Sequence, residues 1–279
     1  MTALPHSPPE SFQNDVWHEE LWLHGVRARA LRFVGGCEDP GRAVVCVAGM
    51  GANGRSFVRQ RPLSDDRFFL MLNLSRETPR DEDPLLFAVE SVEEFMDIYG
   101  LERPVVLGSS FGGAVAAVLA LRRPGRLGGL VLANPVVARS QIPLAFPQFV
   151  NFLEAPDSVA QFMAPMAVQI MGGFGLDRDG RDEIVREARH FTTRELKRRL
   201  HALMKLDLKD RLAELPAKTL WVHGRRDLLV PVTAARKAAR RIPHGRFEVI
   251  SAAGHLPYLS HPEAFNGLLR EFLREVGDA

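Results

Sequence analysis

The chain has 279 residues, of which 46% are hydrophobic and 25% are charged, and its formal net charge is +2. This length allows one large domain with a sizeable core, and the composition is that of an ordinary globular protein. The small net charge argues against nucleic acid as a partner, and no apolar run is long enough for a membrane span. Two cysteines without metal-binding spacing, and no signal-peptide pattern, favour a cytoplasmic location.

The first part of the chain predicts a short tail and then strands. Residues 1–14 are rich in Pro and Ser and are expected to be disordered. Two alternating stretches on either side of Gly25 predict a hairpin. Two continuous apolar runs, Ala43 to Ala48 and Phe68 to Leu74, are typical of strands that are buried on both faces.

Strands and helices then alternate. Asp83 and Pro84 are suited to begin a helix, which Gly100 ends. Further strands are expected at Pro104–Leu107, Leu127–Asn134, Lys218–His223 and Arg246–Ile250, and further helices at Phe111–Arg123, Pro231–Arg241 and Pro262–Val276. This alternation predicts an α/β fold with a mostly parallel twisted sheet flanked by helices, built from residues 15–138 and 206–279.

Residues 139–205 interrupt the alternation with helical segments and are predicted to form an inserted helical cap, or lid. Apolar side chains gather in its first half. They either pack the cap onto the core or line a pocket for an apolar acyl group. The pocket candidates are Phe146, Phe149, Met163 and Met166. The stretch Arg178 to Arg199 mixes charges of both signs and is expected to be a solvated helix face, although Lys197, Arg198 and Arg199 could instead meet an acyl carrier such as acyl carrier protein or coenzyme A.

The most informative motif is Gly108-Ser109-Ser110-Phe111-Gly112, which joins an apolar strand to a helix rich in small residues. A G-x-S-x-G sequence in this setting predicts a sharp turn that presents Ser110 at the carboxyl end of the sheet. The glycines on either side allow strand and helix to approach closely. The alternative is a glycine-rich turn whose serine only caps the helix.

A serine nucleophile needs a base, and the base needs an orienting acid. Asp227 follows the strand that ends at His223, and His255 in the segment Gly254-His255-Leu256-Pro257 follows the next strand. We therefore predict that His255 is the base and Asp227 the acid, although Asp227 could instead cap a turn or pair with a neighbouring arginine. The oxyanion would be held by the backbone N–H groups of Phe111 and Met50. Leu256 is a further pocket candidate, and no metal or cofactor is expected.

With these motifs the chain resembles an α/β-hydrolase-fold serine hydrolase over about residues 25–276. The resemblance is strongest to capped bacterial carboxylesterases and acyl-ester hydrolases, including the pimeloyl-carrier-protein methyl-esterase type. Two loops depart from that pattern: Ala48 stands where the family usually has histidine before the oxyanion glycine, and Asn73 to Arg76 replace an acidic residue and a glycine pair. Both loops are expected to line the mouth of the active site.

The resemblance implies hydrolysis of a carboxylic ester or thioester of a small to medium apolar acyl substrate, through an acyl-enzyme, by a monomer or homodimer. Carbon–carbon bond hydrolysis remains an alternative on the same residues. Leu256 disfavours it, since those hydrolases commonly have Trp after the catalytic histidine. Two further functions stay open for the same residues: cofactor-free perhydrolase or lyase chemistry, and ligand sensing by a receptor with little turnover.

Overall fold

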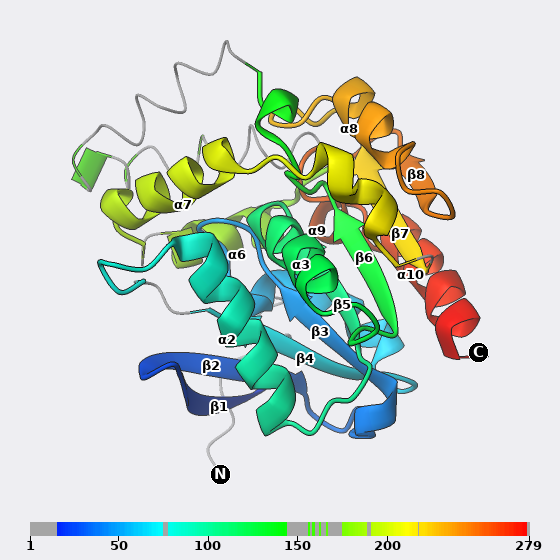
Figure 1. Cartoon of the computed structure of the whole chain (residues 1–279). Helices are drawn as coiled ribbons and strands as arrows, with labels where there is room; N and C mark the ends of the chain where they lie inside the picture. Colours follow the sequence, from blue (N-terminus) through cyan, green and yellow to red (C-terminus); the bar gives the residue numbers. More distant parts are fainter. Residues whose placement is uncertain are drawn as a thin grey trace.

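The computed structural model describes residues 16–74, 78–143, 156, 158–159, 162, 166, 175–188, 191–216 and 218–277. Its strands form one eight-stranded sheet in the order β1-β2-β4-β3-β5-β6-β7-β8. The first three of these strands pair antiparallel, and all later neighbours are parallel (Figure 1). The strands are β1 Val16–Leu23, β2 Val26–Phe33, β3 Ala43–Val47, β4 Phe68–Asn73, β5 Val105–Ser109, β6 Gly129–Ala133, β7 Thr219–Gly224 and β8 Arg246–Ile250.

Helices cover both faces of the sheet. On one face lie α2 (Pro84–Ile98), α3 (Phe111–Arg122) and α8 (Val232–Ala239), and on the other lie η2 (Gly54–Leu63), α9 (Pro257–Ser260) and α10 (Pro262–Gly277). The remaining helices are η1 Pro40–Arg42, η3 Arg139–Gln141, α6 Arg178–Ala188, α7 Thr193–Lys205 and η4 Lys209–Glu214.

The central strands are apolar along their whole length because each of their faces contributes to a core. In β3, Val45 and Val47 pack on the side of α2 and α3, whereas Val44 and Cys46 pack on the side of η2 and α10. All four side chains are fully buried. This arrangement confirms the α/β fold with a mostly parallel sheet that the continuous apolar runs predict.

The predicted start of α2 is confirmed in detail. The side chain of Asp83 accepts hydrogen bonds from the backbone N–H groups of Leu85 and Leu86, and Pro84 occupies the first helical position. These contacts satisfy donors that a helix N-terminus otherwise leaves unpaired.

One expected boundary needs correction, and one helix is present that was not expected. The strand predicted to reach Asn134 ends at Ala133, because Asn134 has a φ of 46°, in the left-handed region that no strand residue adopts. The long 3₁₀ helix η2 is not expected from the sequence. Its segment contains Pro62 and lacks the 3.6-residue apolar period by which helices are recognised.

Residues 139–205 leave and rejoin the core at neighbouring points. Ala138 and Asp207 form an isolated β-bridge, Arg139 N–H donates to the carbonyl of Leu206 (2.9 Å), and Leu208 N–H donates to that of Val137 (2.8 Å). The described helices of this stretch are η3, α6 and α7. The division into core and cap stays a prediction, and residues 1–14 lie outside the described part of the chain.

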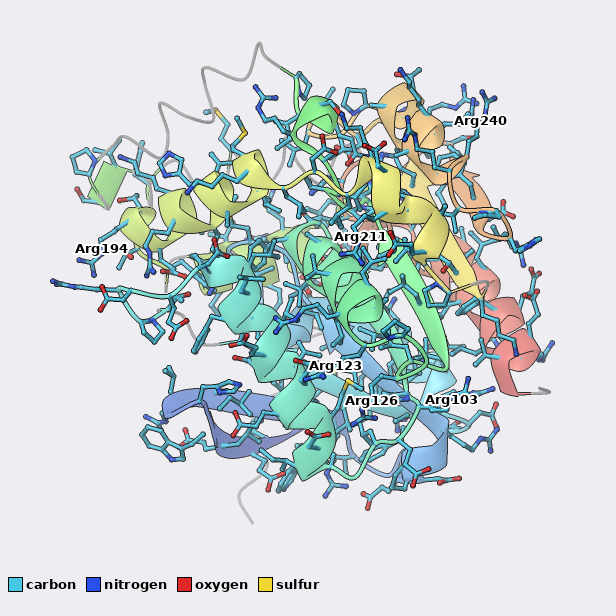
Figure 2. All side chains as sticks on the ribbon, in the orientation of Figure 1. Arg103, Arg123, Arg126, Arg194, Arg211 and Arg240 are labelled. Carbon is cyan, nitrogen blue, oxygen red and sulfur yellow. The ribbon has the colours of Figure 1, made fainter. Side chains whose placement is uncertain are left out.

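Charged side chains lie over the outside of the fold, and Figure 2 labels six of the arginines. Three of the six pair with acidic neighbours: Arg123 with Glu93 (2.5 Å), Arg126 with Asp97 (2.6 Å) and Arg211 with Glu214 (2.8 Å). Such solvated pairs add little to stability. Among the helices that the structure describes, none has the length and apolar character needed to cross a membrane.

Candidate active site

Ser110 occupies a strained turn between β5 and α3. Its φ of 53° and ψ of −113° lie outside the regions that L-residues ordinarily adopt. Its backbone N–H donates to the carbonyl of Ala133 at the end of β6 (3.0 Å), which helps to hold the turn. Such strain costs on the order of 1–3 kcal/mol and persists where the surrounding structure enforces it, commonly at functional sites.

The two motif glycines are required by close backbone contacts. A Cβ atom added at Gly108 would lie 2.2 Å from the carbonyl oxygen of Gly112, and one added at Gly112 would lie 2.1 Å from that of Val47. No side chain fits at these distances. The turn therefore depends on glycine at both positions, as the motif predicts.

The Ser110 side chain does not cap α3, although the residue occupies the N-cap position. The alternative in which this serine serves only as a helix cap is therefore not supported. Gly49 in the loop after β3 lies directly beside it, since a Cβ atom at Gly49 would be 3.3 Å from the Cβ atom of Ser110. The serine thus faces the loop that is predicted to help form the oxyanion hole.

Asp227 and His255 are brought together by the loops after β7 and β8. His255 Nδ1 donates to Asp227 Oδ2 over 2.8 Å, and both residues are buried. The loops touch because Gly224 has no side chain: a Cβ atom there would lie 2.0 Å from the carbonyl oxygen of Gly254. Since Nδ1 carries the proton, Nε2 of the neutral ring is the nitrogen that can accept one.

The carboxylate of Asp227 is well supplied with donors. Oδ1 accepts from the backbone N–H groups of Leu229 (2.8 Å) and Val230 (3.1 Å), and Oδ2 also accepts from Asn134 Nδ2 (2.5 Å). Burial raises the pKa of Asp227, but the charge of His255 and the hydrogen bonds from His255 and Asn134 outweigh that effect and lower it. The acid is thus held in its ionised form.

The two predicted oxyanion donors, Phe111 and Met50, occur in local structures that suit this role. Phe111 is the first residue of α3, so its N–H has no acceptor within the helix. Met50 is the second residue of a turn that is closed by a hydrogen bond from Ala52 N–H to the carbonyl of Gly49 (3.2 Å). Gly51, the third residue, has a φ of 77°, as a type II turn requires.

Helix α7 lies near the loops that follow the carboxyl ends of the parallel strands (Figure 1). A Cβ atom at Gly51 would be 3.4 Å from Leu196 Cδ2, so the helix contacts the turn that contains Met50. The guanidinium of Arg199 lies 5.5 Å from the ring centre of Phe111 and 5.0 Å from that of Phe191. These distances fit cation–π contacts.

The expectation of a solvated face over Arg178–Arg199 is wrong for α7. Glu195 and Arg199 are buried and form an ion pair at 3.0 Å, and Thr78 Oγ1 donates to Glu195 (2.8 Å). Arg198 donates to four carbonyl groups in the loop before α2. Arg198 and Arg199 therefore serve internal contacts, and burial removes Arg199 from the surface on which an acyl carrier would bind.

The predicted pocket residues have different outcomes. Phe146, Phe149 and Met163 lie outside the described residues. Met166 is 53% exposed, whereas Leu256 is buried and packs into the core on the side of η2 and α10. A cavity of about 720 Å³ lies between α7 and the loop before α2, and its lining includes Thr78, Arg80, Glu195 and Arg198 but none of the predicted catalytic, oxyanion or pocket residues.

Within the described ranges, no group of three His, Cys, Asp or Glu side chains is arranged to hold a metal ion. Two further histidines differ in setting: His223 is fully buried, with its Nε2 3.5 Å from Asp227 Oδ2, while His261 is partly exposed. The sequence does not predict that Asn134 contacts Asp227. The polar side chain of Asn134 directly after a buried strand is the signal that could have indicated this contact.

Comparison with known proteins relates the chain to a family and to named relatives. The family model described as alpha/beta hydrolase fold matches residues 42–262. A pimeloyl-[acyl-carrier protein] methyl ester esterase of Aeromonas hydrophila is 34% identical over 181 residues, covering 60% of this chain and 69% of the relative. A 2-hydroxy-6-oxo-6-phenylhexa-2,4-dienoate hydrolase of Comamonas testosteroni is 28% identical over 253 residues, covering 84% and 88%.

Among solved structures, an esterase from Exiguobacterium antarcticum superposes with a TM-score of 0.80 at 19% identity, covering 91% of this chain and 97% of that one. At this identity the likeness concerns the fold alone. The family model, in contrast, spans most of the chain, from the strand before the Gly49 loop to the start of the last helix. The chain therefore belongs to the alpha/beta hydrolase fold family.

Proposed function

We propose that this protein is a serine hydrolase that cleaves a carboxylic ester or thioester of a small to medium apolar acyl group. Ser110 is the nucleophile, His255 the general base and Asp227 the acid that orients the imidazole. The observation that carries the proposal is the 2.8 Å hydrogen bond between His255 Nδ1 and Asp227 Oδ2, at the sheet edge where β5 ends in the strained Ser110.

The reaction would begin when His255 Nε2 takes the proton of the Ser110 hydroxyl as the oxygen attacks the acyl carbonyl. Asp227 stabilises the imidazolium that forms. The N–H groups of Phe111 and Met50 hold the negative charge on the carbonyl oxygen. His255 then protonates the leaving alcohol or thiol, which leaves an acyl group on Ser110. Water, activated by the same histidine, releases the acid and restores the enzyme.

The test is a panel of nitrophenyl esters and acyl thioesters of graded chain length, assayed with the wild-type protein, Ser110→Ala and Ser109→Ala. Ser109 is the matched control, because it is the neighbouring serine and its hydroxyl is buried. We expect multiple turnover for wild type and Ser109→Ala, with a preferred chain length, and loss of turnover for Ser110→Ala with its fold intact. Ordinary activity in Ser110→Ala would refute the proposal, and a single turnover by wild type would favour a receptor.

The panel contains both esters and thioesters because one of the relatives is an esterase that acts on an acyl-carrier-protein substrate. A second candidate, carbon–carbon bond hydrolysis, is supported by the relative from Comamonas testosteroni. Leu256 after the histidine disfavours it. A vinylogous 1,5-diketone included in the panel separates the two activities, because an esterase of this kind leaves it intact.

A further inference from the structure

Asn134 directly follows β6 and is fully buried. Its φ of 46° turns the chain out of the strand, while its backbone N–H still donates to the carbonyl of Val222 in β7 (3.0 Å). A non-glycine residue in this conformation is uncommon, although asparagine adopts it more readily than most residues. The side chain is thereby directed across β7 toward the loops that carry Asp227 and His255.

The carboxamide of Asn134 binds both of these loops at once. Nδ2 donates to Asp227 Oδ2 (2.5 Å), with a longer contact to the carbonyl of Gly254 (3.4 Å), and Oδ1 accepts from the backbone N–H of Gly224 (3.2 Å). Donor and acceptor are both needed, and an amide supplies both without charge. One neutral side chain therefore connects the ends of three neighbouring strands.

The nearby imidazole of His223 does not make the hydrogen bond to Asp227 that Asn134 makes. That ring lies 3.5 Å from Asp227 Oδ2, but its Nε2 donates to the carbonyl of Val230 (2.8 Å) and its Nδ1 accepts from Trp221 Nε1 (3.3 Å). Both ring nitrogens are thus occupied elsewhere. Oδ2 of the acid is bound by Asn134 on one side and by His255 on the other.

We propose that Asn134 is a positioning residue of the active site, which aims the Asp227 carboxylate at His255 and fixes the acid loop to the histidine loop. The inference rests on the proposed function and adds to it a residue that touches neither substrate nor reacting atoms. Hydrogen bonds to buried charged groups are strong, so removal of this donor should lower kcat roughly 10- to 100-fold. The KM should change little, because Asn134 is fully buried and acts through Asp227.

Three variants test this role: Asn134→Ala, Asn134→Asp and the control Asn266→Ala. Asn266 is also buried, donates to the carbonyl of Arg59 (2.8 Å) and accepts from Gln60 (3.1 Å), far from the acid in the sequence and on α10. Asn134→Asp keeps the shape of the side chain, which keeps the inference testable if the alanine variant does not fold. In that variant a protonated carboxyl group can donate to Asp227, whereas an ionised one repels it.

We expect Asn134→Ala to lower kcat at every pH. Asn134→Asp should be active at low pH, and the ratio of its kcat to the wild-type kcat should fall as the pH rises. Asn266→Ala should lose thermal stability but keep its kcat and the shape of its pH profile. A ratio for Asn134→Asp that does not vary with pH would overturn the inference. So would a kcat for Asn134→Ala within about twofold of wild type.

A second measurement does not depend on turnover. The proton that His255 shares with Asp227 should give a low-field ¹H NMR signal, which we expect to shift or vanish in Asn134→Ala and to stay unchanged in Asn266→Ala. An unchanged signal in Asn134→Ala would overturn the inference. If the wild-type protein cleaves no ester or thioester, the proposed function fails, and this signal still decides whether Asn134 positions the acid.

Discussion

The imidazole of His255 and the carboxylate of Asp227 meet through a 2.8 Å hydrogen bond, although they lie in loops after two different strands. If this bond serves catalysis, Asp227→Asn should lower kcat by about 10⁴-fold with little change in KM, because an amide permits the wrong histidine tautomer and cannot stabilise imidazolium. Steady-state kinetics with the preferred nitrophenyl ester measure this effect.

Asp83→Asn is the matched control for that variant, since it also replaces a carboxylate by an amide and keeps the acceptor that caps α2. We expect its kcat to stay within about twofold of wild type, as only the distant helix cap is altered. A kcat for Asp227→Asn in the same range would show that the histidine does not need this carboxylate, and the mechanism would have to be abandoned.

Gly112 should be important for stability. A Cβ atom there would lie 2.1 Å from the carbonyl oxygen of Val47, so strand and helix would have to separate. We expect Gly112→Ala to lower the free energy of unfolding by roughly 1–3 kcal/mol, the cost typical of overpacking. Denaturant unfolding followed by circular dichroism measures the change.

Gly267→Ala is the opposite case. Gly267 lies within α10, and nothing comes within 4 Å of the position of an added Cβ atom. Alanine there should raise the free energy of unfolding by roughly 0.5–1 kcal/mol, because it restricts the unfolded chain and favours the helix. Equal effects of the two substitutions would show that the close contact at Gly112 is not the reason why the turn between β5 and α3 needs glycine there.

Met50 allows the proposed oxyanion donor to be removed without loss of its turn. Because Gly51 has a φ of 77° and Ala52 N–H closes the turn onto Gly49, Met50 occupies the position at which type II turns favour proline. Met50→Pro should therefore fold normally but lack the N–H, which predicts a decrease in kcat of roughly 10²–10³-fold.

Met50→Ala keeps the N–H and removes only the side chain. We expect its kcat on the shortest ester to stay within about fivefold of wild type, while the preferred chain length shifts because the pocket wall has changed. Stopped assays over the ester panel separate the two variants. If Met50→Pro retains the activity of Met50→Ala, the second oxyanion donor is a different group.

Much of the site could be predicted because each of its parts has a local signal. Continuous apolar runs mark the central strands, and parallel strands place the residues that follow them at one edge of the sheet. Ser110, Asp227 and His255 each directly follow or lie close after such a run. The place of each residue at the end of a strand could therefore be predicted without knowing which strands are neighbours in the sheet.

Other contacts depend on packing that the sequence does not reveal. The role of Asn134 requires the register of three strands, and the same residue type after a strand also suits an ordinary turn. The ion pair between Glu195 and Arg199 lies in a segment so rich in charges that a solvated face was the simpler expectation. It is buried because α7 packs against Phe111, the turn around Gly51 and the loop that contains Thr78.

His223 should make the stability of the protein depend on pH. The ring is fully buried, its Nε2 donates to the carbonyl of Val230 and its Nδ1 accepts from Trp221 Nε1, so the folded protein holds it neutral. Burial lowers its pKa, and the raising effect of Asp227 does not compensate. In the unfolded chain a histidine takes up its proton near pH ~6.5, above the pH at which the folded state does so.

As the pH falls from about 7 to about 5, the unfolded state therefore binds the proton of His223 first, and the free energy of unfolding decreases. Stability from this residue is fully present above pH ~6.5 and is lost below it. In His223→Gln, whose amide can still donate to Val230, the decrease between the two pH values should be smaller than in wild type. The exposed His244 supplies the control, because His244→Gln should keep the wild-type dependence. Urea unfolding at both pH values decides the matter: an identical decrease in His223→Gln and wild type would mean that the buried imidazole is not the group that titrates.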